Sequence, residues 1–218
     1  YCIIPKLRGN YRSVPMEELL VEAEQLAKEG TKELIVIAQE TTVYGVDLYG
    51  EKRLPELLQA LCKIDGIEWI RLLYCYPEEI TKELVQTIKT EKKICHYLDL
   101  PIQHCNNDIL KRMGRKTTQA DLREKISMLR KEIPDIALRT TLISGFPGET
   151  NENHEECVDF VANMKFERLG VFPYSPEEGT PAAEYDRQLP DEIKQEWADE
   201  IMQTEQNVIF AQNEEMIG

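Results

Sequence analysis

A strand-to-helix unit lies in the second half of the chain and reads IALRTTLISGFPGET over residues 136–150. Its first part, residues 136–144, is rich in branched and apolar side chains and predicts a buried strand. A loop with two glycines follows, and Thr150 can cap a helix that we expect to run to Met164. A strand that leads through a short loop into a helix is the repeating unit of an α/β fold with a parallel sheet.

The same alternation extends along the whole chain. The predicted strands are Leu34 to Ala38, Trp69 to Leu73, His96 to Leu100, Ile136 to Ser144 and Leu169 to Phe172. The predicted helices span residues 16–27, 55–63, 78–90, 120–132 and 150–164, and a last one begins at Pro190. This order fits a doubly wound sheet or an incomplete barrel, and in both folds ligands bind at the carboxyl ends of the strands.

Composition limits the class of protein. The 218 residues are 42% hydrophobic, which is enough to form the core of one globular domain. The sequence shows neither a long apolar run nor a signal peptide, so we expect a soluble, cytoplasmic protein. The net charge of -14 disfavours naked nucleic acid as a partner and favours a basic one. The six cysteines are scattered singly, which is typical of reduced thiols.

Five loops after the predicted strands are rich in polar residues, glycine and proline. They span residues 39–45, 74–77, 101–104, 145–150 and 173–176. Each is compatible with ordinary turn chemistry, but together they predict a binding site on one rim. Gly145 and Gly148 allow the backbone to approach a ligand closely. The loop lacks the Gly-Lys-Ser/Thr ending of a Walker loop, which disfavours ATP hydrolysis.

Two further features have competing interpretations. The segment CHYLDLPIQHC, residues 95–105, holds four potential zinc ligands, but its two Cys-His pairs lie nearly a strand length apart and disfavour tetrahedral convergence. Arg139 interrupts an apolar strand, so it needs a partner. That partner is either a carboxylate such as Asp99 or the carboxylate of a ligand.

Several segments, taken in chain order, resemble the central domain of the RimO branch of the radical-SAM methylthiotransferases. They are YCIIPKLRGNYRS at 1–13, AQETTVYG at 38–45, LPIQH at 100–104, LKRMGR at 110–115, RTTLISGFPGET at 139–150 and YSPEEGT at 174–180. Of the two α/β folds considered above, the resemblance implies the incomplete barrel, in the form of a (β/α)6 TIM-like barrel. Residues 1–218 would then form the radical-SAM core, with the first strand largely missing and the amino-terminal methylthiotransferase and carboxyl-terminal TRAM domains absent.

The resemblance also implies two cofactors, S-adenosylmethionine (SAM) and a 4Fe-4S cluster, with a second cluster in the full-length enzyme. Cys2 matches the third cysteine of the family's CxxxCxxC loop, so the other two ligands would precede Tyr1. The chain starts without methionine and stops after a long helix, which fits an excised piece. We therefore expect this chain alone to be unable to hold its cluster.

The resemblance assigns cofactor-binding residues to the predicted loops and to one strand. They are Gln39 and Glu40 at the methionine part of SAM, Gln103 and His104 at the ribose, Gly145, Phe146 and Tyr174 around the adenosine, and Arg139. The sequence departs from the expected Arg-Ser-Arg-Pro in having Val14, so any role of that second arginine is lost.

The implied activity is the addition of a methylthio group to the β-carbon of an aspartate in ribosomal protein S-twelve (uS12), with an electron donor such as flavodoxin or ferredoxin. It implies no membrane and no direct nucleic-acid binding by this domain. One alternative is the branch that modifies a tRNA adenosine, which tends to show Gln-Ser-Gly-Ser where this chain has Gln103 and His104. Others are a scaffold barrel without clusters and a metal-independent TIM-type enzyme, although the loops lack a clear acid-base pair.

Overall fold

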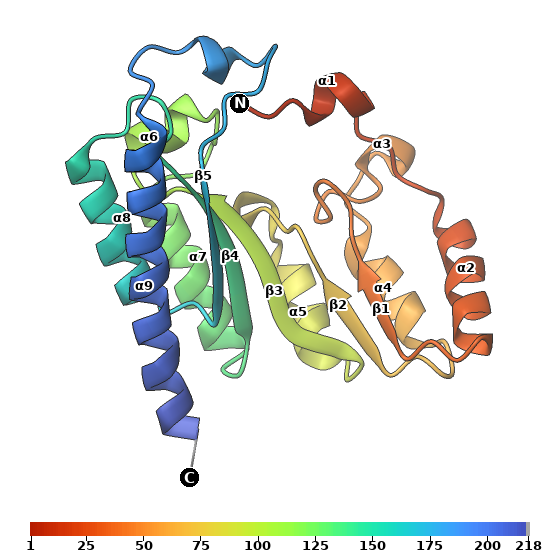
Figure 1. Cartoon of the computed structure of the whole chain (residues 1–218). Helices are drawn as coiled ribbons and strands as arrows, with labels where there is room; N and C mark the ends of the chain where they lie inside the picture. The colour runs from red at the N-terminus through yellow and green to blue at the C-terminus, as the bar shows by residue number, and fades with distance from the viewer. Residues whose placement is uncertain (217–218) are drawn as a thin grey trace. The chain divides into compact units, whose positions relative to one another are not determined.

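The computed structural model describes residues 1–216, which form two compact units (Figure 1). Unit 1 comprises Tyr1–Gly9, Pro101–Ser127 and the chain from Ala137 onward; unit 2 comprises Asn10–Leu100 and Met128–Ile136. Five strands form one sheet in the order β1-β2-β3-β4-β5. The pairs β1 with β2, β2 with β3, and β4 with β5 are parallel, which confirms the predicted α/β class.

Unit 2 contains the first half of the fold. Its elements are α2 (Met16–Lys28), β1 (Glu33–Val36), α3 (Val46–Tyr49), α4 (Leu54–Cys62), β2 (Trp69–Leu72), the 3-10 helix η1 (Pro77–Glu79), α5 (Lys82–Thr90) and most of β3 (Ile94–Gln103). The helix α4 buries Leu54, Leu57, Leu58 and Leu61 on its inner face. Apolar residues at this spacing form one stripe of a helix, and α4 packs with α2 and α5.

Unit 1 contains the second half and the first residues of the chain. Its elements are α1 (Ile4–Arg8), α6 (Asn107–Arg112), β4 (Ala137–Ser144), α8 (Asn151–Met164), β5 (Arg168–Pro173), the 3-10 helix η2 (Pro181–Glu184) and α9 (Asp191–Met216). The helix α7 (Gln119–Glu132) and strand β3 pass from one unit to the other. Figure 1 shows α8 and α9 alongside β4 and β5.

All five predicted strands are confirmed, with ends that differ by at most three residues. The largest difference is β3, which continues through Pro101 where we expected a loop. Proline has no N–H to donate, but the Pro101 carbonyl accepts a hydrogen bond from Arg115 Nη2.

The predicted long helices are confirmed, with one correction at residues 78–90. That segment opens with the 3-10 helix η1, and α5 begins only at Lys82, where Thr81 Oγ1 accepts a hydrogen bond from Leu84 N at 3.1 Å. The short helices α1, α3 and α6 were not predicted from the sequence. Each has six residues or fewer, too short to display a helical period.

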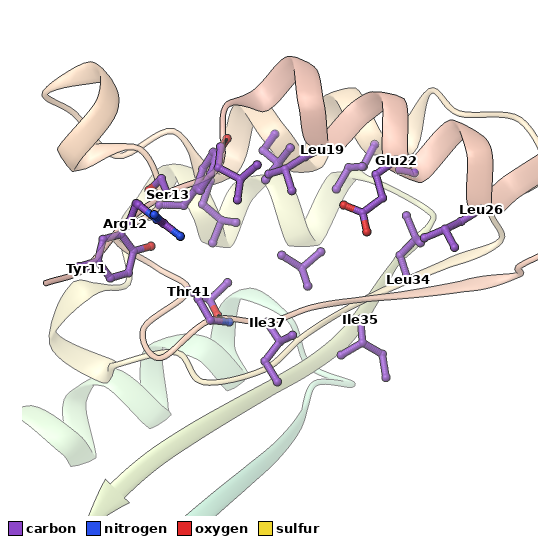
Figure 2. Close-up of a pocket in the computed structure, with 18 residues that line it drawn as sticks. Tyr11, Arg12, Ser13, Leu19, Glu22, Leu26, Leu34, Ile35, Ile37 and Thr41 are labelled. Carbon is purple, nitrogen blue, oxygen red and sulfur yellow. Dashed lines mark hydrogen bonds between the residues drawn. The ribbon is translucent and has the colours of Figure 1, made fainter. Parts of the chain in front are cut away.

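Strand β1 is at one end of the strand order and has an open edge. Ile35 and Ile37, near this edge, are 53% and 58% exposed. A groove of about 360 Å³ runs between β1, α2 and α4, with Tyr11, Arg12 and Ser13 at one end and the apolar side chains of Leu26 and Leu34 at the other (Figure 2). Unit 2 therefore presents apolar surface that nothing in residues 1–216 covers.

Among residues 1–216, every helix is too short or too polar to span a lipid bilayer. The longest, α9, packs against β5 and α8. His154 of α8 stacks on Trp197 of α9 with ring centroids 4.8 Å apart, and its Nε2 lies 2.7 Å from Glu200 Oε2. These contacts fix the amino-terminal half of α9 within unit 1, and nearer its other end Gln212 Nε2 donates a hydrogen bond to the Lys165 carbonyl at 3.2 Å.

Helix α9 also buries a carboxyl group. Glu205 is 2% exposed, and neither of its carboxyl oxygens has a hydrogen-bond partner among the described residues. Burial and, to a smaller extent, the nearby Glu167 raise the pKa of Glu205 to about 7, although Arg168 partly offsets them. Burial does so because a charged carboxylate loses its hydration there.

Replacing Glu205 with glutamine should stabilise the protein at pH 8 and change little at pH 4. The folded state holds this proton up to about pH 7, whereas an ordinary glutamate releases it near 4.5, so folding stability falls as the pH rises through that window. Glutamine removes the titration. We expect a gain of about 1–3 kcal/mol at pH 8 from urea unfolding. The exposed Glu196→Gln is the control, and equal effects of both variants would contradict the prediction.

Candidate functional site

A cavity of about 420 Å³ opens in unit 1 at the carboxyl end of β5. It is lined by Tyr1, Cys2, Ile3, Ile143, Phe172, Pro173, Tyr174, Ser175 and Glu177. Cys2 is exposed, and its thiol is free. Two residues predicted at the site, Cys2 and Tyr174, therefore line the same cavity although they are far apart in the sequence.

An aromatic cluster stands behind this cavity. Phe146 is fully buried, and its ring makes edge contacts with Tyr1, Tyr174 and Tyr185 at centroid distances of 6.0, 5.1 and 6.3 Å. Phe146 thus supports the wall from within, since Tyr1 and Tyr174 line the cavity and it does not. Its predicted contact with adenosine stays a prediction.

Tyr174 carries an unused polar group in this wall. Its side chain is buried, and its hydroxyl has no hydrogen-bond partner among the described residues. Burial, and then the neighbours Glu177 and Tyr185, raise the pKa of Tyr174, so the phenol keeps its proton. A buried phenol that lacks a partner can donate a hydrogen bond to a ligand.

Gly145 adjoins other protein atoms on the side where a Cβ would stand, and its predicted contact with adenosine stays a prediction. Its φ is +70°, and a Cβ at this position would lie 2.3 Å from Cγ of Lys194. The space beside Gly145 is therefore filled by the first turn of α9, and not left open for a ligand. Sequence reasoning missed Lys194 because nothing in the local pattern connects it to a loop 49 residues earlier.

Gln103 ends β3, and His104 follows it, in unit 1. Gln103 is half-buried with φ of +71°, a left-handed backbone that is uncommon for a residue with a side chain. His104 is 1% exposed; its Nδ1 accepts a hydrogen bond from Asn106 N at 3.0 Å, and its Nε2 lies 3.1 Å from Glu149 Oε1. The imidazole therefore faces protein atoms, and its predicted ribose contact stays a prediction.

Glu149 connects this histidine to the glycine-rich loop. Its Oε2 accepts a hydrogen bond from Phe146 N at 2.9 Å, and the residue is 4% exposed. Burial alone would lower the pKa of His104, but Cys157 and Glu149 more than compensate and raise it. Glu149 was not among the predicted site residues, although it stands in the quoted loop. A buried carboxylate there fixes both the loop and His104.

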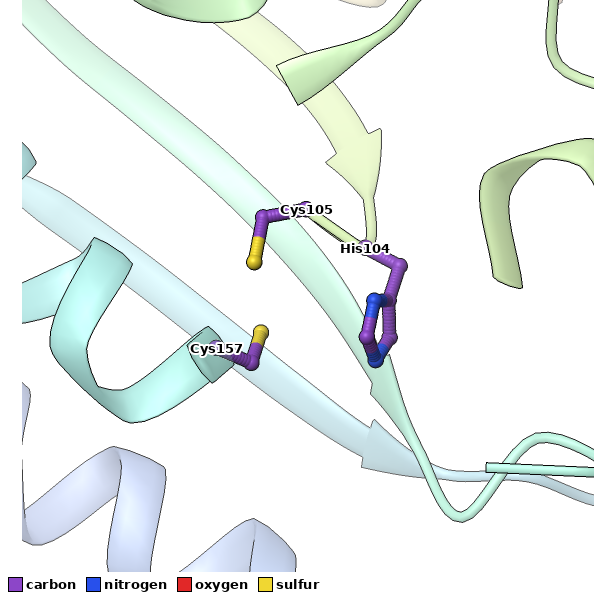
Figure 3. Close-up of side chains that lie close together, drawn as sticks. All are labelled: His104, Cys105 and Cys157. Carbon is purple, nitrogen blue, oxygen red and sulfur yellow. The ribbon is translucent and has the colours of Figure 1, made fainter. Parts of the chain in front are cut away.

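A group of possible metal ligands lies beside His104. Figure 3 shows the sulfur atoms of Cys105 and Cys157 facing each other next to the His104 ring, with the ligand atoms of all three within 4.8 Å of one another. The ring nitrogens already face Asn106 and Glu149, and a hydrogen bond with Cys105 together with burial raises the pKa of Cys157. These contacts favour ordinary packing of the three side chains in the interior and disfavour a metal centre.

The zinc alternative within residues 95–105 is also disfavoured by the partners that each histidine already has. His96 belongs to unit 2, where its Nδ1 lies 2.7 Å from Asp135 Oδ1, whereas His104 belongs to unit 1. The two Cys-His pairs therefore have separate surroundings.

Two of the remaining predicted residues, Gln39 and Glu40, lie in unit 2 after the end of β1. Glu40 is 9% exposed, and its Oε1 accepts hydrogen bonds from the Thr42 amide at 2.9 Å, the Thr42 hydroxyl and Tyr76 N. Its Oε2 is buried and has no partner among the described residues. Burial raises the pKa of Glu40, and Gln39 beside it is exposed. One carboxyl oxygen is thus left for a ligand.

Arg139 lies in β4, five residues before its carboxyl end at Ser144. That separation is roughly 16 Å along a strand, and in the register its neighbour is Arg168 of β5. Asp99, the suggested partner, accepts a hydrogen bond from Tyr74 N at 3.1 Å in unit 2. The position within β4 favours the structural interpretation of Arg139, and a ligand contact stays a prediction.

Comparisons with known proteins place these features in context. The family model described as the radical SAM superfamily matches residues 1–161. The chain is 63% identical over all 218 residues to the ribosomal protein uS12 methylthiotransferase RimO of Lachnoclostridium phytofermentans and 54% identical to the protein of the same name from Clostridioides difficile. It spans 50% and 49% of their lengths, so it corresponds to about half of these curated relatives.

Two solved structures share the fold. The radical SAM methyltransferase TsrM of Kitasatospora setae, with cobalamin and a 4Fe-4S cluster bound, has a TM-score of 0.57 and 18% identity, covering 73% of this chain and 31% of that one. SuiB of Streptococcus suis has a TM-score of 0.59 and 18% identity, covering 90% and 42%. At this level of identity the likeness establishes the fold alone.

Proposed function

Because the chain belongs to the radical SAM superfamily, in its RimO branch, we propose that it is the catalytic core of a uS12 methylthiotransferase. The full-length protein would add a methylthio group to the β-carbon of an aspartate in uS12. The observation that carries this proposal is the 63% identity to a RimO protein along the entire chain. The net charge of -14 supports it, because ribosomal proteins are basic.

The residues present fit SAM and one edge of a 4Fe-4S cluster. Cys2 offers an exposed thiol at the cavity of unit 1, while Tyr174 Oη and Glu40 Oε2 are buried polar atoms that lack a partner among the described residues. When bound, the reduced cluster supplies the electron that cleaves SAM to methionine and a 5′-deoxyadenosyl radical. Within unit 1, Cys2 would hold one iron and Tyr174 would donate a hydrogen bond to the adenosyl part of SAM; the family resemblance alone assigns Glu40, in unit 2, to the methionine part.

The remaining predicted residues have supporting roles in this proposal. Gln39 and Gln103 offer amide groups to the polar parts of SAM, and His104 acts through Glu149, which fixes the loop of Phe146. Gly145 leaves room for the Lys194 side chain, because a Cβ at position 145 would clash with it.

We infer that further segments complete the domain in the full-length protein. The open edge of β1 and its apolar groove fit an additional parallel strand, and the relatives are about twice as long as this chain. The other two cluster cysteines, the methylthiotransferase domain with the second cluster, and a TRAM domain would come from those segments. A flavodoxin or ferredoxin would donate the electron, and the reaction would occur in the cytoplasm.

The test uses the full-length protein, reconstituted anaerobically with iron and sulfide and supplied with SAM and reduced flavodoxin. We expect 5′-deoxyadenosine and a mass increase of one methylthio group on uS12, localised to an aspartate. The 218-residue chain alone should do neither. Modification of a tRNA anticodon stem-loop in place of uS12 would contradict the substrate, and a full cluster without 5′-deoxyadenosine would contradict the reaction.

A further inference from the structure

Lys194 is a buried lysine in the first turn of α9. It is 3% exposed, and its backbone carbonyl accepts a hydrogen bond from Ser144 Oγ at 2.8 Å, which docks this turn on the end of β4. Its Nζ lies 2.9 Å from Oδ1 of Asp191, whose side chain is 92% exposed. An ion pair with so exposed a partner contributes little, so it does not explain why the lysine is buried.

A second contact of Lys194 is with Tyr174. The ammonium lies 5.6 Å from the centroid of the Tyr174 ring, within the range of a cation–π interaction. Lys194 can take this position because Gly145 has no side chain: a Cβ there would lie 2.9 Å from Cβ of Lys194 and closer still to Cγ. Gly145, Ser144 and Lys194 therefore form one fitted contact that places a cation against the aromatic ring.

Tyr174 contacts Lys194 and also lines the cavity that contains Cys2. Its ring touches Phe146 edge-on at 5.1 Å and lines the cavity, and its hydroxyl has no partner among the described residues. With Phe146 at one contact and Lys194 at another, the ring has few alternative orientations. The direction of the unused hydroxyl is thereby set before any ligand binds.

We propose that Lys194 is a positioning residue, which holds the Tyr174 ring so that its hydroxyl and ring face meet the adenosyl part of a bound nucleoside cofactor. The inference rests on the proposed function, because that function assigns SAM to this cavity. Lys194 acts through Tyr174 and touches no reacting atom. Its effect is therefore on cofactor affinity and not on the rate of the bound complex.

The test compares Lys194→Met, which keeps an unbranched apolar side chain as far as Cε and removes the charged Nζ, with Lys194→Arg in the reconstituted full-length enzyme. We expect Lys194→Met to raise the Kd and the KM for SAM roughly tenfold, with kcat for 5′-deoxyadenosine formation within about twofold of the wild type. Lys194→Arg should restore most of the affinity. Lys89→Met, on the exposed surface of α5, is the matched control and should leave both constants unchanged.

Two further measurements separate positioning from simple loss of structure. In the cluster-free protein, Lys194→Met should alter the near-ultraviolet circular dichroism of the tyrosines while the far-ultraviolet spectrum stays the same. Combined with Tyr174→Leu, it should add almost nothing to the loss of SAM affinity. An unchanged Kd in a folded Lys194→Met protein, or additive losses, would overturn the inference. Because SAM binding is measured without uS12, failure of the proposed substrate would appear separately, as normal SAM affinity without methylthio transfer.

Discussion

Replacement of Cys2 by serine should abolish methylthio transfer by the full-length protein, leaving less than about one thousandth of the wild-type rate. Iron in such a cluster is held by thiolates, and an alcohol does not replace them. Cys2 is exposed at the cavity that Tyr174 lines, so its loss removes the proposed cluster ligand at this cavity. Iron analysis and the absorption spectrum of the reconstituted protein should show that one cluster is missing.

The control for this prediction is Cys62→Ser. Cys62 ends α4 in unit 2, and burial raises its pKa to about 11, so it remains a protonated thiol. This variant should keep the iron content and the 5′-deoxyadenosine yield of the wild type. If Cys2→Ser also kept both, Cys2 would not be a cluster ligand and the match to the family's cysteine loop would be wrong.

Replacement of Glu149 by alanine should destabilise the protein by about 3–5 kcal/mol, the cost of breaking a buried ionic pair from one side. One carboxyl oxygen, Oε2, accepts a hydrogen bond from Phe146 N, and the other, Oε1, lies within ion-pair distance of His104 Nε2 at 3.1 Å. Without them a buried amide and a buried imidazole lose their partner, and neither is accessible to water. Urea unfolding of the full-length protein measures the loss.

Two further variants make this prediction specific. Glu155→Ala, at an exposed position of α8, should change stability by less than about 0.5 kcal/mol. Glu149→Gln keeps an acceptor for the Phe146 amide and should therefore lie between alanine and the wild type. Equal stability of the two alanine variants would mean that the His104–Glu149 contact does not stabilise the fold.

Local sequence patterns predicted the helices and strands well, because these elements depend on residues that are close together in the chain. The helix α8 follows Thr150, whose side chain accepts from Asn153 N while Asn153 returns the bond, a capping box formed by four consecutive residues. Strand β4 alternates half-buried and buried positions along its length, and its predicted end at Ser144 is correct. The start of α5 was wrong because Glu78 and Glu79 suit a helix, but Pro77 begins a 3-10 turn there and the cap is Thr81.

The sequence alone determined the alternation of strands and helices and, through several motifs in family order, the radical SAM membership of the chain. Tertiary structure alone decided how the predicted residues are used. Only folding brings Lys194 against Gly145, and His104 against Glu149, across gaps of tens of residues. The reason is physical: hydrogen bonds and hydrophobic period act between chain neighbours and can be read locally, whereas packing and charge burial depend on partners that the local pattern does not specify.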